Sequence, residues 1–181
     1  MPLTTYTSGE VLTAASLNAN FTFAAANPVS KVGQVLSTAL LTSFTTSSTS
    51  YTDITGLSVS ITPTVNTSKV LVMVQLIASQ EVGVNQALVQ LVRGTTPIDI
   101  GDAAGSRSQA TQQIRGFGAE YPSVNTFVYL DSPATTSATT YKMQAINLSS
   151  GTFFVNRSMT DTNTSFYART ASTITVMEIL A

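Results

Sequence analysis

Two segments of this sequence alternate with a period of two and are apolar on both of the resulting faces. They are SKVLVMVQLIAS, residues 68–79, and STITVMEIL, residues 172–180. A period of two is that of a β-strand, whose successive side chains point to opposite faces of a sheet. A strand that is apolar on both faces has to be covered on both sides, by a second sheet or by a partner subunit. The chain is therefore constrained to a layered β-protein.

Further segments have the pattern of strands and are separated by turns. In GLSVSITP, residues 56–63, Leu57, Val59 and Ile61 alternate with serine and threonine, and Pro63 ends the run. Other expected strands lie at 85–94, near 110–115, and at 124–133, 139–147 and 151–158. Short strands in this number are typical of two packed sheets. We predict an all-β fold, a jelly-roll-type β-sandwich over residues 31–181.

The chain begins with a segment of a different kind, TSGEVLTAASLNANFTFAAANP, residues 7–28. Ala14, Leu17 and Phe21 recur at helical spacing, Thr13 can cap the start, and Pro28 ends the pattern. A helix this short is marginal by itself in water, so it has to pack on its own domain or on a neighbouring protein. We predict that residues 1–28 are a short helical and extended segment that attaches the body to another protein.

The composition excludes several classes of function. The chain has 181 residues, of which only 9% are charged, and a formal net charge of −1. Eight scattered basic residues do not make a nucleic-acid-binding surface. The longest apolar run is too short and too interrupted to cross a membrane, and no secretion signal is visible. We therefore expect neither nucleic-acid binding nor membrane insertion.

The residue types that catalysis and metal binding most often use are absent or scattered. The chain has no histidine and no cysteine, which removes the commonest general base and the commonest metal ligands. A glycosidase needs two carboxylates that face each other across a sugar, and no spacing among the nine carboxylates selects such a pair. We expect a protein that is not an enzyme and that has no cofactor and no metal site.

Two parts of the chain resemble known virion proteins of tailed phages. The segment YTSGEVLTAASLNANF, residues 6–21, resembles the N-terminal segment of many phage tail-fibre and related virion proteins. The matching positions are Val11 or Leu12, Thr13, Ala14, Ala15, Leu17, Asn18 and Phe21. Residues 50–76, 127–147 and 172–179 look like virion domains with a trimeric jelly roll of the tumour-necrosis-factor/C1q type.

The resemblance implies a structural or adhesive component of the virion that forms homotrimers. A tail fibre or a receptor-binding component is the first expectation, docked to other virion proteins through Leu12, Ala15, Leu17, Asn18 and Phe21. A capsid decoration protein or a head fibre is the alternative, because it would need the same docking segment and trimeric body. A third class, a soluble lectin unrelated to virions, predicts saccharide binding and no use for residues 1–28.

The last apolar strand, 172–180, supplies the expected trimer contacts. A symmetric oligomer can cover such a strand by placing it near its axis, which assigns Ile174, Val176 and Glu178 to the trimer interface. A buried Glu178 requires a partner. Either an arginine (Arg93, Arg115 or Arg169) pairs with it, in the same or another subunit, or this face is exposed at the strand end.

Aromatic and basic side chains in the expected loops are candidates for contact with a host receptor. Aromatic rings stack on the faces of sugars and anchor protein interfaces. Phe117, Tyr121 and Arg157 lie in or beside such loops, and a cell-surface saccharide is the expected receptor. Core or subunit contacts are the competing interpretation for most of these aromatic residues.

Overall fold

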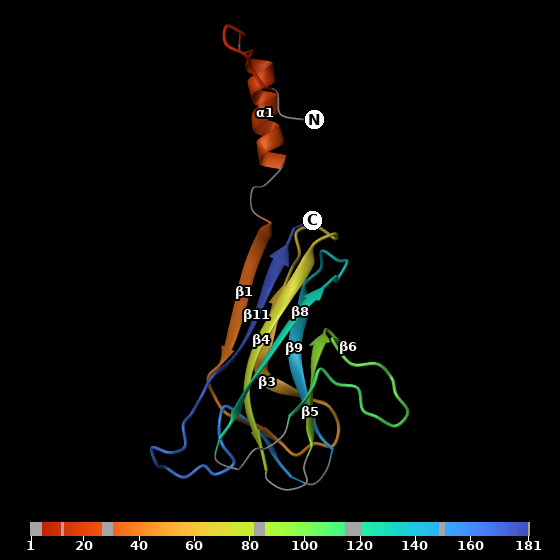
Figure 1. The fold of residues 1–181 in the computed structure, drawn as a ribbon, viewed down its shortest axis with the longest axis vertical. Coiled ribbons are helices and arrows are strands. Elements are labelled where there is room, and N and C mark those ends of the chain that lie inside the picture. The colour runs from red at the N-terminus through yellow and green to blue at the C-terminus, as the bar shows by residue number, and fades with distance from the viewer. Residues whose placement is uncertain are drawn as a thin grey trace. The chain divides into compact units, whose positions relative to one another are not determined.

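The computed structural model describes residues 5–11, 13–26, 31–81, 86–114, 121–148 and 151–180. The chain divides into two compact units, Met1–Lys31 and Val32–Ala181. Figure 1 shows one helix in the first unit and a body of antiparallel strands in the second. We refer to the second unit as the body.

The first unit contains the helix α1, Ala14–Ala26. Thr13 caps this helix, because its Oγ1 accepts a hydrogen bond from the Ser16 N–H at 3.2 Å. Its carbonyl oxygen accepts the first helical bond, from the Leu17 N–H at 3.0 Å. The helix and the Thr13 cap predicted from the sequence are confirmed.

The body is a sandwich of two antiparallel sheets, which confirms the predicted all-β, jelly-roll-like fold. The first sheet has the order β1 (Val32–Leu40), β11 (Ser172–Ile179), β4 (Lys69–Gln80), β10 (Phe153–Val155) and β2 (Phe44–Thr46). A sixth strand, β8 (Ser123–Asp131), pairs with β4 on the side opposite β11 and β10. The second sheet has the order β3 (Thr52–Ile61), β9 (Thr139–Asn147), β5 (Ala87–Arg93) and β6 (Thr96–Ile98), and β7 (Gln112–Ile114) also pairs with β5.

The core lies between the two sheets and contains the apolar side chains that alternate inward along each strand. From the first sheet these are mainly Val70, Val72, Val74 and Leu76 of β4, with Ile174 and Val176 of β11. From the second sheet they are Leu57, Val59 and Ile61 of β3 and Tyr141, Met143 and Ala145 of β9. Burial of these faces supplies the main stabilisation of the body.

The body has two distinct ends, which the length of β4 separates. At one end β1 begins, where Val32 pairs with Ile179 and Ile179 pairs with Lys69 at the start of β4. At the other end the Ser79 hydroxyl donates a hydrogen bond to the Arg157 carbonyl oxygen at 2.8 Å. Ten residues of strand span roughly 33 Å. We call these the entry end, where the chain enters the body, and the loop end (Figure 1).

Candidate interaction surface

Apart from Lys69 at the entry end of β4, the outer face of the first sheet carries no charged residue across four adjacent strands. Hydrogen-bonded registers place β1, β11, β4 and β8 side by side in this order, so that outward side chains form rows across the sheet. We call this surface the uncharged face. Its members are Val32, Val35, Ser37 and Ala39 of β1, Thr173, Thr175, Met177 and Ile179 of β11, Leu71, Met73, Gln75 and Ile77 of β4, and Val124, Thr126, Val128 and Leu130 of β8.

Apolar side chains at the two margins of the uncharged face are strongly exposed. Val35 on β1 is 50% exposed, and Val124 and Val128 on β8 are 60% and 62% exposed. Between the margins lies a shallow hollow of about 290 Å³, lined mainly by Met73, Gln75, Thr126, Val128, Thr173 and Thr175. Exposed apolar side chains gathered on one face make it a candidate surface for contact with another protein.

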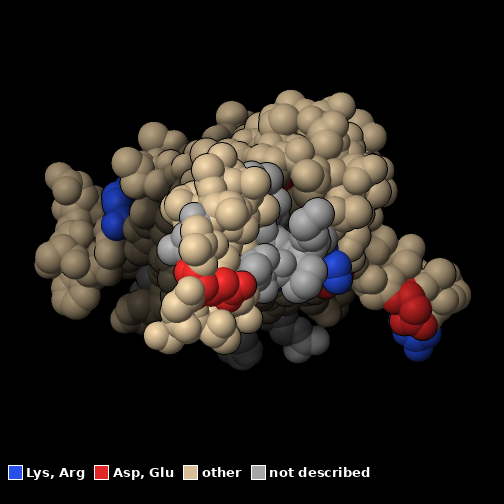
Figure 2. All heavy atoms as spheres, turned by 90° about the horizontal axis from the view of Figure 1, so that it is seen from above, with Lys and Arg blue, Asp and Glu red and all other residues tan. Residues whose placement is uncertain are grey.

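Charged side chains are also few on the rest of the protein surface, since only 9% of the residues are charged. Figure 2 shows one side of the molecule, where a few basic and acidic side chains are scattered among uncharged ones. At the entry end, Lys69 occupies the first position of β4, next to the uncharged face. The rows between Leu71 and Ile77 offer no charge, so an uncharged partner surface would match them electrostatically.

The three residues predicted for the trimer interface lie on the opposite side of β11. Ile174, Val176 and Glu178 are 0% exposed in the single chain, inside the sandwich. They are therefore unavailable to a neighbouring subunit. Alternate positions of the same strand, including Thr175 and Met177, face outward on the uncharged face instead.

The hydrogen-bond donors that hold the buried Glu178 are neutral groups of Thr64 and Gln34. They are not the arginines expected from the sequence. Oε1 of Glu178 accepts hydrogen bonds from the N–H of Thr64 at 2.6 Å and from the Thr64 hydroxyl at 2.8 Å. Its Oε2 accepts one from Nε2 of Gln34 at 2.9 Å. A Cβ on Gly33 would lie 2.7 Å from Oε2, so the strand needs a glycine beside this carboxylate.

These donors keep Glu178 ionised inside the protein. Burial raises the pKa of a carboxyl group, because it penalises the charged form. Hydrogen bonds from Gln34 and Thr64 act in the opposite direction and prevail, so that the pKa of Glu178 falls to about 2. Glu178 thereby ties β11 to β1 and to the loop that precedes β4.

Two of the arginines considered as partners of Glu178 pair with other carboxylates, and Arg115 lies outside the described residues. Nη1 of Arg93 donates to both carboxylate oxygens of Asp131, at 2.8 and 2.9 Å. The buried Tyr141 hydroxyl donates to the same Asp131 at 2.6 Å. Burial and the Asp131 carboxylate raise the pKa of Tyr141. Arg169 pairs with Asp161 at 2.7 Å, near the loop end.

The residues predicted to attach the chain to a virion lie on or beside α1. Ala15, Leu17, Asn18 and Phe21 are exposed, Leu17 by 41% and Phe21 by 65%. Leu17 and Phe21 are four residues apart, so they share one side of the helix. Leu12 lies outside the described residues.

The three predicted receptor contacts differ in their availability. Tyr121 is 68% exposed, two residues before β8 begins at the loop end. Arg157 is largely engaged within its own loop, where Nε and Nη2 donate to the carbonyl oxygens of Ser158 and Met159. Its guanidinium also lies 4.9 Å from the centre of the Phe154 ring. Phe117 lies outside the described residues.

Reasoning from single residues of the sequence missed the uncharged face. A signal for it was present in residues 68–79, where the second apolar side of the strand required a cover. Only the register of four strands, three of them distant in the sequence from β4, shows that their outward residues join into one surface.

The described part of the chain contains neither a cluster of metal ligands nor a membrane-spanning helix. There, no group of three or more histidine, cysteine, aspartate or glutamate side chains is arranged to hold a metal ion. Nor does any helix in that part have the length and apolar character needed to cross a membrane. In comparisons with known proteins, no family model matches the chain, and no curated protein matches it.

Proposed function

We propose that this chain is a non-enzymatic structural protein of a phage virion, a tail fibre or receptor-binding component. In this proposal three copies assemble through the uncharged face, residues 1–28 dock the trimer to the particle, and the loop end meets the host. The resemblance of residues 6–21 to tail-fibre N-termini supports the virion context. The uncharged face is the observation that carries the assembly.

The layout of the uncharged face favours a cyclic trimer. In a ring, each subunit presents one patch to one neighbour and a different patch to the other. The exposed margins on β1 and β8, separated by a hollow, supply two such patches. A two-fold dimer would instead bring one patch against its own copy.

The two ends of the body favour receptor binding over the alternative, capsid decoration. Residues 1–31 join the body at the entry end, where β1 begins. Tyr121 and the loop held by Arg157 lie at the other end of the sandwich, roughly 33 Å away by strand length. A receptor-binding protein needs attachment and recognition on opposite ends, whereas a decoration protein needs only attachment. Binding to empty capsids with a gain in their heat resistance would favour the alternative.

A charge placed on the uncharged face tests the assembly. Val128 lies on an exposed margin, so Val128→Glu should leave the single chain folded while placing an unpaired charge in each of the contacts between copies. Burying such a charge costs several kcal/mol. We expect light scattering to give a mass near the 19.0 kDa of one chain for this variant.

The matched control is Ser58→Glu, which adds the same charge to an exposed position of the second sheet, opposite Lys142. This variant should keep the native mass of the unaltered protein. If Val128→Glu retains that mass too, the uncharged face is not the contact between copies.

A further inference from the structure

The loop between β6 and β7, residues 99–111, is longer than the connection of two strands requires. Loops of this length that carry no secondary structure are commonly functional. The loop closes on itself, since the Gly101 N–H donates to the Ala110 carbonyl at 3.3 Å and Nε2 of Gln109 donates to the Gly101 carbonyl at 2.6 Å. Tyr51 fixes it from outside with a bond of 2.9 Å to the Gln109 carbonyl. The loop is thus held in one shape before any ligand arrives.

Its return to the sheet is fixed as well. The Thr111 N–H donates to the Val89 carbonyl at 3.0 Å, and the Thr111 hydroxyl accepts a bond from the Leu91 N–H at 3.0 Å. Both bonds attach the loop to β5, which forms the floor beneath it.

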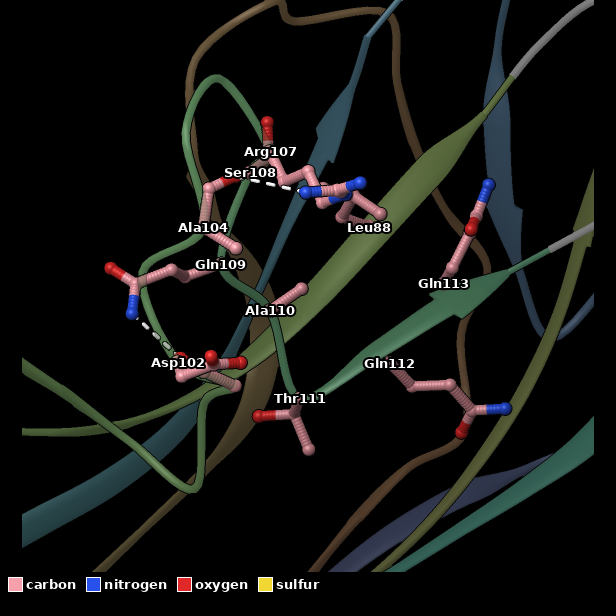
Figure 3. A pocket seen from close by; sticks show the side chains of 11 residues that line it. Leu88, Asp102, Ala104, Arg107, Ser108, Gln109, Ala110, Thr111, Gln112 and Gln113 are labelled. Carbon is pink, nitrogen blue, oxygen red and sulfur yellow. Dashed lines mark hydrogen bonds between the residues drawn. The ribbon is translucent and has the colours of Figure 1, made fainter.

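A pocket of about 340 Å³ lies between this loop and the strands β5 and β7. Its volume is at the lower end of the range of small-ligand pockets, roughly 300–1,000 Å³. Figure 3 shows Asp102, Arg107 and Gln109 on the loop and Gln112 and Gln113 on β7. All five side chains are exposed, but Gln112 and Gln113 are neighbours on a strand and point to opposite faces, and Nε2 of Gln112 donates to Oδ1 of Asn125 on β8 at 3.2 Å. Gln113, the register partner of Leu88, is therefore the glutamine of β7 that faces the pocket.

The pocket combines an apolar floor with a polar rim of zero formal charge. Leu88, the second residue of β5, is the buried part of the floor, and Ala104 and Ala110 are half-buried beside it. Arg107 lies next to Leu88 in Figure 3, and its hydrogen bond is a long one, 3.4 Å to the Ala104 carbonyl. Among the described residues Asp102 and Arg107 form no ion pair with each other.

This chemistry points to a neutral saccharide. Sugar hydroxyl groups both donate and accept hydrogen bonds, and so do the side-chain amide groups of Gln109 and Gln113. Asp102 adds an acceptor and Arg107 adds donors, with their formal charges cancelling. The apolar floor suits the C–H face of a sugar ring. We propose that this pocket binds one or two residues of a neutral host saccharide, an inference that rests on the receptor-binding role proposed above.

The position of the pocket agrees with that role. β5 begins at the loop end, where Ala87 pairs with Asn147 and the Asn147 N–H donates to the Ser48 carbonyl at 2.8 Å. Leu88 follows directly, so the pocket opens beside the loop end and away from the uncharged face, which belongs to the other sheet.

Saturation-transfer NMR on the full chain tests the proposal, with maltotriose, cellotriose and mannotriose as neutral probes at millimolar concentration. We expect transfer to at least one of them. The double variant Arg107→Ala, Gln113→Ala should weaken its binding roughly tenfold or more, as the loss of one or two hydrogen bonds predicts. The matched control is the double variant Lys142→Ala, Gln144→Ala. It also removes one cation and one amide, but from β9, which is in the same sheet and does not line the pocket. It should bind like the unaltered protein.

Three results would overturn the inference: no transfer to any probe, equal affinity of the pocket variant and the unaltered protein, or binding only to an anionic probe such as dextran sulfate. The native mass of the same samples separates this inference from the proposed assembly. A trimer that binds no trisaccharide contradicts the pocket alone, whereas a monomer that binds one contradicts the assembly alone.

Discussion

Several buried polar side chains in this protein connect strands through hydrogen bonds inside the sandwich. Glu178 is the clearest case, a carboxylate buried without a basic partner among the described residues and held by Thr64 and Gln34. The alternation of residues 172–180 placed it correctly on the face of Ile174 and Val176, but both expectations for it, an arginine partner and exposure at the strand end, are wrong. The sequence could not identify neutral donors, because Thr64 and Gln34 come from segments far away in the chain and make no recognisable motif.

The lowered pKa of Glu178 makes the stability of the protein depend on pH in a defined window. The stabilisation is fully present above the usual pKa near 4.5 and is lost as pH falls toward the folded-state value of about 2. It amounts to about 3 kcal/mol, as a shift of this size implies. Glu178→Gln should lower the free energy of unfolding at pH 7 by about 1–3 kcal/mol and flatten its decline between pH 4.5 and 2.

Urea unfolding at pH 7 and pH 3, at one protein concentration, measures both effects. The control is Asp53→Asn, which removes an exposed carboxylate paired with Lys142 and should cost at most about 1 kcal/mol. A Glu178→Gln protein as stable as the unaltered one at pH 7 would show that these hydrogen bonds contribute nothing net.

At the scale of elements, hydrophobic periodicity predicted the buried strands well and the edges poorly. The expected strands at 68–79, 139–147 and 172–180 are present, because their alternation reflects the core they build. β1 was missed, since much of its apolar surface stays exposed at an edge, and β2 and β6 are too short to show a period. The uncharged face was not predictable for a related reason, as it depends on which strands become neighbours.

One contact across the elements is expected to hold the two sheets together near the entry end, where Asp131 pairs with Val70. Asp131 of β8, in the first sheet, binds Arg93 of β5 and Tyr141 of β9, in the second. Asp131→Ala would leave the Tyr141 hydroxyl buried without an acceptor, so we expect a loss of about 2–4 kcal/mol in the free energy of unfolding. Tyr141→Phe, which removes the donor and keeps the ring, should cost less, about 1 kcal/mol.

Thermal and urea unfolding of both variants measure the difference. An equal loss of unfolding free energy in the two variants would contradict this explanation. It would mean that the Tyr141–Asp131 hydrogen bond accounts for the whole loss and that leaving the other buried groups unpaired costs nothing.

The whole molecule consists of a short helical unit and a β-sandwich body, and the proposed function assigns them separate tasks. Deleting residues 1–28 should leave the unfolding temperature and the number of chains in the assembly unchanged, because the helical segment and the body are two separate compact units. The truncated protein should fail to join particles. Leu17→Asp with Phe21→Asp is a gentler test of the same segment. A deletion that unfolds the body would make α1 part of its structure and would contradict the attachment role.

The most direct test of the central claim is the native mass of the unaltered protein by light scattering. Assembly through the uncharged face predicts a trimer, near three times 19.0 kDa, at micromolar concentration. Val128→Glu then provides the link from that mass to the face itself. A mass of 19.0 kDa for the unaltered protein would contradict the claim, since the exposed apolar margins on β1 and β8 would then face solvent.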